Sequence, residues 1–147
     1  MPSAVSPFGA PNLPSAVSPF AAPNLPPSAV SPFGAPEMKK DFAPLLQTVN
    51  DCTAVCERAI TRLLSSHDVR NRELQFQLLR DCATVCDFTA CFLARGSAFS
   101  RQAAALCAVI CEACGMECSR FPDAESQHCA RICLHCAREC RAFTGMY

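Results

Sequence analysis

The chain has 147 residues, and its 13 lysines and arginines balance its 13 aspartates and glutamates. This balance leaves no basic surface for nucleic acid or an anionic membrane, and no apolar run approaches the length of a transmembrane span. The unusual feature of the composition is its 13 cysteines, an odd number that leaves at least one thiol unpaired.

The amino terminus, MPSAVSPFGAP, lacks the positive start and the apolar stretch of a secretory signal. We therefore expect a cytoplasmic protein. Thiols stay reduced in that compartment, so a dense set of cysteines there indicates metal binding or catalysis rather than a disulfide framework.

Residues 1–36 differ in composition from the rest of the chain. They hold ten of the twelve prolines, no charged residue and no cysteine, and they form an imperfect triple repeat that begins at Pro2, Pro14 and Pro27. Proline at this density removes the backbone donors that helices and sheets require. We predict a disordered, Pro-rich tail over residues 1–36, followed by a folded domain over residues 37–147.

Each copy of the repeat keeps the sequence Ser-Ala-Val-Ser-Pro-Phe. One interpretation is a simple spacer. The other is multivalent docking, because linked weak motifs raise the effective concentration of one another at a partner protein. On the docking hypothesis, the anchors are Val5, Phe8, Val17, Phe20, Val30 and Phe33.

Helical patterns fill the folded domain. Pro44 is tolerable in a first helical turn, Gly96 suits the position after a helix end, and the Phe-Pro-Asp sequence at 121–123 interrupts the pattern. Four helices with short connections predict an all-α, antiparallel four-helix bundle. The helices are predicted over residues 41–65, 72–95, from Ser97 or Ser100 to 120, and 124–143.

The same five-residue core occurs in every predicted helix, as CTAVC, CATVC, CAVIC and CARIC. In the third and fourth helices it extends to CxxxCxxCxxxC, and at about 100° per residue these four positions fall on one narrow stripe. The bundle core is therefore predicted to be lined with thiols. The predicted core cysteines are Cys52, Cys56, Cys82, Cys86, Cys107, Cys111, Cys114, Cys118, Cys129, Cys133, Cys136 and Cys140.

A buried free cysteine can simply act as a small hydrophobic residue, but leucine or isoleucine fills a core better and carries no oxidation hazard. Twelve thiols in register therefore favour metal binding. A continuous row of thiols offers many positions of low coordination number, which suit several Cu(I) ions. The alternatives are a zinc or mixed-metal thiolate buffer and a thiol redox protein.

Cys91 lies about 180° from Cys82 on the helical wheel, so we assign it to helix–helix or subunit packing rather than to the metal site. Thioether or imidazole side chains near one end of the bundle could bind a metal ion as it enters the core. The possible entry residues are Met116, His67 and His135, although histidines at such positions are more often surface or boundary residues and methionine is more often a filler of space.

The CxxxCxxCxxxC stripes of the last two predicted helices, with CATVC and the following Ala-Arg-Gly-Ser (94–97) of the second, resemble the copper storage proteins. The resemblance covers about residues 41–143. It implies a homotetramer of four-helix bundles that stores many Cu(I) ions on the twelve core cysteines and performs no reaction. The tail is similar to the Pro-rich extensions that direct cargo into encapsulin shells. This second resemblance implies an encapsulin partner and a place inside a protein nanocompartment.

Overall fold

The computed structural model describes residues 42–145. The predicted disorder of the tail and its six docking anchors lie outside the described residues. The described part contains four α-helices and a short 3₁₀ helix, η1 (Val69–Asn71), which the sequence did not predict. The α-helices are α1 (Ala43–Leu63), α2 (Glu73–Ala94), α3 (Ser100–Cys118) and α4 (Ala124–Thr144).

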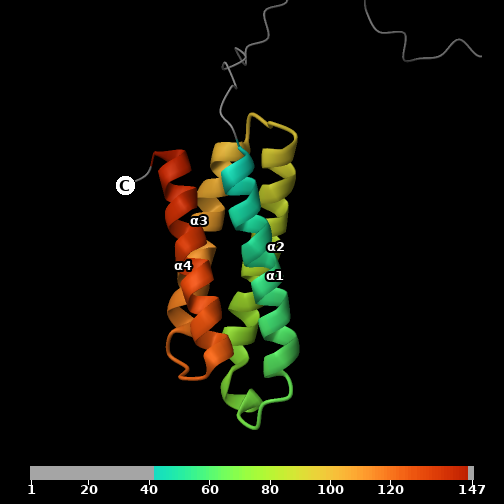
Figure 1. Cartoon of the computed structure of the whole chain (residues 1–147), viewed down its shortest axis with the longest axis vertical. Helices are drawn as coiled ribbons and strands as arrows, with labels where there is room; N and C mark the ends of the chain where they lie inside the picture. Colours follow the sequence, from blue (N-terminus) through green and yellow to red (C-terminus); the bar gives the residue numbers. More distant parts are fainter. Residues whose placement is uncertain (1–41, 146–147) are drawn as a thin grey trace, which may run out of the picture. The chain divides into compact units, whose positions relative to one another are not determined.

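The four helices run alternately up and down and form one closed ring. Each helix packs against the next along the chain, and α4 packs against α1 (Figure 1). The connections are short, as an antiparallel arrangement of neighbours requires. The predicted all-α four-helix bundle is confirmed, and no described helix is long and apolar enough to cross a membrane.

The helix ends follow local chemistry. Pro44 lies in the first turn of α1, and Gly96 adopts a φ of 60° just after α2, where a left-handed residue closes the turn. The side chain of Asp123 accepts a hydrogen bond from the backbone N–H of Ser126 at 2.9 Å and so caps α4. Of the two predicted starts of α3, Ser100 is correct, because Ser97 lies in the preceding turn.

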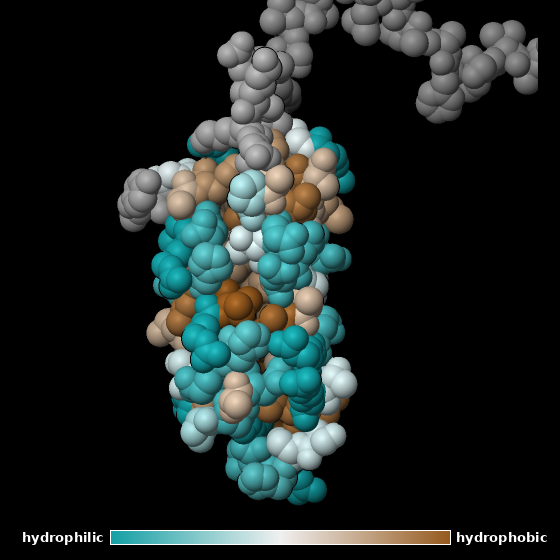
Figure 2. All heavy atoms as spheres, viewed as in Figure 1, coloured by the Kyte–Doolittle hydropathy of each residue, from teal (hydrophilic) through white to brown (hydrophobic). Residues whose placement is uncertain are grey.

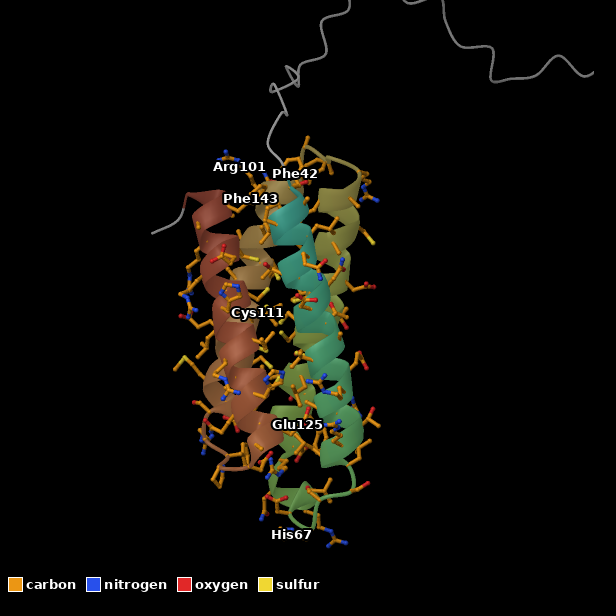
Figure 3. All side chains as sticks on the ribbon, viewed as in Figure 1. Phe42, His67, Arg101, Cys111, Glu125 and Phe143 are labelled. Carbon is orange, nitrogen blue, oxygen red and sulfur yellow. The ribbon has the colours of Figure 1, made fainter. Side chains whose placement is uncertain are left out.

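The two ends of the bundle are closed by different chemistry. At the end that holds the start of α1 and the end of α4, Phe42 and Phe143 meet edge to face with ring centroids 5.4 Å apart (Figure 3). At the other end, the α1–α2 and α3–α4 connections meet around the buried side chain of Arg72. One end is therefore closed by an aromatic contact, and the other, the polar end, by a buried arginine with its polar partners.

Helices α3 and α4 approach closely at Gly115. A Cβ atom at this position would lie 2.7 Å from Cγ of Leu134 and 3.2 Å from the backbone oxygen of Ala130. A Cβ atom essentially never has a non-bonded contact as short as 2.7 Å. Glycine at 115 therefore permits the spacing of α3 and α4, the two helices that supply most of the thiols.

Candidate metal centre

The twelve cysteines that the sequence placed in the core are all fully buried. Each has 0% of its surface exposed, and their sulfur atoms form a column along the inside of the bundle. Cys111 lies at mid-height in this column (Figure 3). Helices α3 and α4 contribute four thiols each, and α1 and α2 contribute two each.

Neighbouring sulfur atoms are close but not bonded. The Sγ of Cys111 lies 3.5 Å from those of Cys82 and Cys86, 3.6 Å from that of Cys107 and 3.8 Å from that of Cys136. A disulfide bond would be about 2 Å long, so these thiols are free. At each of these separations, one metal ion can bind both sulfur atoms.

A second hub lies at Cys133. Its Sγ is 3.6 Å from that of Cys56 and 3.7 Å from that of Cys129, and three more sulfurs lie at 3.8 Å. These three belong to Cys52, Cys82 and Cys114. Thiols from all four helices therefore converge on this hub.

Four overlapping groups of four thiols have all their sulfur atoms within 4.8 Å of one another. Each group shares two members with another group, and at most two groups can be filled together without a shared sulfur. The donor set of these groups is sulfur alone, which is the preference of a soft metal ion. The groups are Cys52/Cys82/Cys86/Cys111, Cys52/Cys56/Cys82/Cys133, Cys56/Cys114/Cys129/Cys133 and Cys86/Cys107/Cys111/Cys136.

Burial opposes the ionisation of the column's thiols when metal is absent, and the effect is clear at Cys133. The neighbouring thiols of Cys114 and Cys129, together with burial, raise the pKa of Cys133 well above its ordinary value. A metal ion that binds there must displace the thiol proton, so binding releases protons and stabilises the folded state.

The polar end of the column is closed by a glutamine that the sequence reasoning missed. Gln75 is 1% exposed, and its Nε2 lies 3.6 Å from the Sγ of Cys118 and 2.8 Å from Oγ of Ser126. Its Oε1 accepts a hydrogen bond from Arg72 at 2.9 Å. The signal was present in the helical period, because Gln75 precedes Cys82 by seven residues and Cys86 by eleven, on the same stripe of α2.

Arg72 makes several polar contacts beside Gln75. Its guanidinium pairs with the carboxylates of Asp68 and Asp123, each at 2.8 Å, and lies 4.3 Å from the centre of the Phe121 ring. The Arg72 hydrogen bond lowers the pKa of Asp68 from its ordinary 3.8 to about 2. Only 4% of Arg72 is exposed, and Gln75 connects it by hydrogen bonds to Cys118.

The remaining predicted residues do not join the column. Cys91 is exposed on the outer side of α2, so it does not pack between the helices of its own bundle. His67 lies exposed in the α1–α2 connection, Met116 is 61% exposed in the last turns of α3, and His135 is exposed in the middle of α4. The structure does not bring these three possible entry residues together.

Comparison with known proteins gives consistent matches. A family model described as copper storage protein matches residues 38–145. The uncharacterized cysteine-rich protein YhjQ of Bacillus subtilis is 35% identical over 70 residues, which are 48% of this chain and 65% of that protein. The chain thus spans a little less than two thirds of this curated relative.

Two solved structures share the fold of this chain. The Cu(I)-bound copper storage protein BsCsp3 has a TM-score of 0.68 and 31% identity over 70% of this chain and 97% of its own. A cytosolic copper storage protein from Streptomyces lividans, in a structure with five coppers, has a TM-score of 0.68 and 27% identity, over 71% of this chain and 92% of its own.

Proposed function

The chain belongs to the copper storage protein family, and from that premise we propose that it stores many Cu(I) ions on the thiols inside its bundle. The observation that carries the proposal is the complete burial of twelve cysteines in one column of sulfur contacts. Storage, not catalysis, is the role of the family, and the four described thiol groups consist of cysteines alone.

Overlap between the thiol groups favours copper over zinc. A tetrahedral Zn²⁺ site needs four sulfurs of its own, so only two such sites fit among the four groups. Cu(I) accepts fewer sulfur ligands, and one thiolate can serve two ions. A column of shared thiols therefore has a much larger capacity for Cu(I) than for Zn²⁺.

The test is an anaerobic titration of the reduced protein with Cu(I) in the presence of a chromogenic chelator. We expect an end point that approaches the number of buried cysteines. A parallel Zn²⁺ titration should saturate at about two ions, because at most two of the four thiol groups can be filled without sharing a sulfur atom. Saturation with one to three Cu(I) ions, or a preference for Zn²⁺, would show a buffer with discrete sites instead.

The location and assembly of the protein form a second part of the proposal. We infer a cytoplasmic homo-oligomer, which the cytosolic Streptomyces lividans relative supports for the location. The tetramer implied by the family resemblance is the expected state. Light scattering of the purified protein tests it against the mass of 15.8 kDa for one chain.

The role of the Pro-rich tail is the third part of the proposal. We propose that residues 1–36 form a targeting segment, separate from the storage domain, whose repeats dock on an encapsulin shell. The repetition of one valine- and phenylalanine-bearing motif three times supports this role. Replacing Phe8, Phe20 and Phe33 with serine should abolish copurification with a coexpressed shell.

The matched control for the tail replaces other repeat positions with alanine. These positions are Ser6, Ser18 and Ser31. This control should copurify like the unchanged chain. Equal recovery of both variants with the shell would contradict docking through the phenylalanines and leave the copper proposal intact.

A further inference from the structure

Two cysteines, Cys118 and Cys140, form the two ends of the sulfur column. Cys118 is the last residue of α3, at the polar end, and Cys140 lies three residues before Phe143, at the aromatic end. Neither belongs to the four thiol groups, but each interacts with two thiols of an adjoining group. The interacting thiols are Cys114 and Cys129 for Cys118, and Cys107 and Cys136 for Cys140.

The two ends of the column differ in what lies beside the terminal sulfur. Nε2 of Gln75 donates a hydrogen bond to Sγ of Cys118 at 3.6 Å. Among residues 42–145, this is the one hydrogen bond that a side chain outside the column makes to any of the twelve sulfurs, and Cys140 receives none. Gln75 therefore acts on one end of the column and not on the other.

The amide of Gln75 is locked in the orientation that points an N–H group at the sulfur. Its Oε1 accepts a hydrogen bond from Arg72 at 2.9 Å, and Nε2 also donates to Oγ of Ser126 at 2.8 Å. Both hydrogens of Nε2 are thus used, one for Ser126 and one for Cys118. A reversed amide would set its N–H groups against the guanidinium, with donors facing donors. Gln75 therefore remains a donor toward Cys118.

The charged groups around Gln75 support this orientation. Arg72 is 4% exposed and pairs with Asp68 of the α1–α2 connection and with Asp123, the cap of α4, each at 2.8 Å. The surface around the α1–α2 connection is hydrophilic (Figure 2). Gln75 therefore links the last sulfur of the column to the charged groups of this end.

An N–H donor beside a sulfur atom affects any copper ion bound there. A thiolate that binds Cu(I) keeps negative charge, and a hydrogen-bond donor stabilises that charge. The donor also occupies one lone pair, so the sulfur binds copper on its other side, toward the rest of the column. Hydrogen bonds of this kind to metal ligands typically change metal affinity by about 10–100-fold.

We propose that Gln75 is a positioning residue for copper at the polar end, where it holds Cys118 as the terminal ligand of the last Cu(I) ion. The amide strengthens the binding of that ion without touching it. Copper at Cys140 has no such support from the described part of the chain. This role rests on the proposed storage of Cu(I) by the column, and it adds a residue that supplies no ligand atom.

Gln75→Glu tests the donor, because glutamate has nearly the shape of glutamine. A carboxylate at this position still accepts hydrogen bonds from Arg72 and Ser126, but it has no hydrogen for Cys118 and its charge repels the thiolate. Cu(I) at Cys118 should therefore be lost at a chelator concentration at least about tenfold lower than in the unchanged chain. Gln75→Leu removes the donor without adding charge. It should shift the loss in the same direction, and it supplies the same test if the buried carboxylate prevents folding.

Tandem mass spectrometry locates the copper that is lost. The copper-loaded protein is mixed with increasing amounts of a Cu(I) chelator and then with an alkylating reagent, which modifies thiols that have released their metal. In Gln75→Glu, Cys118 should be alkylated at a lower chelator concentration, while the alkylation of Cys140 should follow that in the unchanged chain. A variant that merely loosened the fold would expose both terminal thiols together.

Gln77→Glu is the matched control, because Gln77 is exposed on the same helix. It should leave the alkylation of both terminal thiols unchanged. Release of copper from Cys118 no earlier in Gln75→Glu than in Gln77→Glu overturns the role of Gln75. Earlier release from Cys118 and Cys140 alike overturns it as well.

The same titration distinguishes this role from the storage function. The number of Cu(I) ions bound by the unchanged chain reports storage, and the order in which the terminal thiols lose copper reports the role of Gln75. A full complement of ions with the same order of loss in every variant overturns the role of Gln75 alone. An unchanged chain that binds only a few Cu(I) ions overturns the storage function, and the role of Gln75 with it.

Discussion

The side-chain nitrogen Nε2 of Gln75 lies 3.6 Å from the sulfur of Cys118 and donates a hydrogen bond to it at the end of the thiol column. The contact joins the metal-binding interior to a buried polar cluster of Arg72, Asp123 and Ser126. Stability of the metal-free protein at this end therefore depends on a satisfied polar network as well as on hydrophobic packing.

Replacing Gln75 with leucine should destabilise the metal-free protein. The change removes the buried hydrogen bonds of Gln75 with Cys118, Ser126 and Arg72 and leaves only the 3.1 Å contact between Arg72 and Ser126 at this point, which costs about 1–3 kcal/mol. Urea unfolding of the reduced apoprotein measures the loss. Gln77→Leu, on the exposed side of α2, should change the free energy of unfolding by less than about 0.5 kcal/mol. Equal effects of both changes would contradict a structural role for the buried amide.

The ion pairs of Arg72 predict a pH dependence at acidic pH. The pKa of Asp68 is held at about 2 by Arg72, and that of Asp123 is also lowered: burial opposes this shift, but hydrogen bonds from Ser126 and Arg72 outweigh it. A carboxyl group with a lowered pKa in the folded state stabilises the protein above its ordinary pKa. That stabilisation is lost as the pH falls through the folded-state value.

Arg72→Met should therefore lower the melting temperature of the apoprotein at pH 6, and the difference from the unchanged chain should shrink between about pH 4 and pH 2. Arg70→Met, in η1 of the same connection, should show no such convergence. A difference that stays constant down to pH 2 would mean that Arg72 acts through packing alone.

Gly115→Ala should destabilise the bundle. The new methyl group would lie 2.7 Å from Cγ of Leu134, so α3 and α4 must separate or Leu134 must move, at a cost of about 1–3 kcal/mol. Thermal unfolding of the apoprotein measures the effect. Adding Leu134→Ala should recover part of the loss if the clash is with the side chain. No recovery would point instead to the backbone oxygen of Ala130 at 3.2 Å.

Removal of single thiols should distinguish column positions from surface positions. Cys111→Ser deletes a sulfur with four sulfur neighbours within 3.8 Å and should lower the Cu(I) end point by about one ion or more. Cys91→Ser deletes an exposed sulfur outside all four thiol groups and should leave the end point unchanged. A loss of capacity with Cys91→Ser would place metal on the surface of α2.

Periodicity explains why the fold and the thiol stripe were predictable. Cysteines spaced by four, three and four residues must share one face of any α-helix, and the turn residues at Gly96 and Asp123 delimit the helices. The burial of all twelve predicted core cysteines follows from these local rules, because four amphipathic helices can hide their common faces only inside a bundle.

The entry residues were less predictable. Ligand chemistry is the basis for predicting Met116, His67 and His135, and the structure places them at separate exposed positions. A methionine or histidine next to a cysteine in the sequence need not point into the core with it. Neighbouring residues of an α-helix differ in direction by about 100°.

The sequence by itself determined four helices, one thiol-bearing face on each, and Cys91 as the exception, because these depend only on the helical repeat and on local turn chemistry. Only the tertiary structure decided which thiols meet across helices, with Cys111 and Cys133 as hubs. It also decided that Gln75 closes the column. These features depend on the axial register and rotation of packed helices, which are set by contacts such as that of Gly115 with Leu134 between residues distant in the chain.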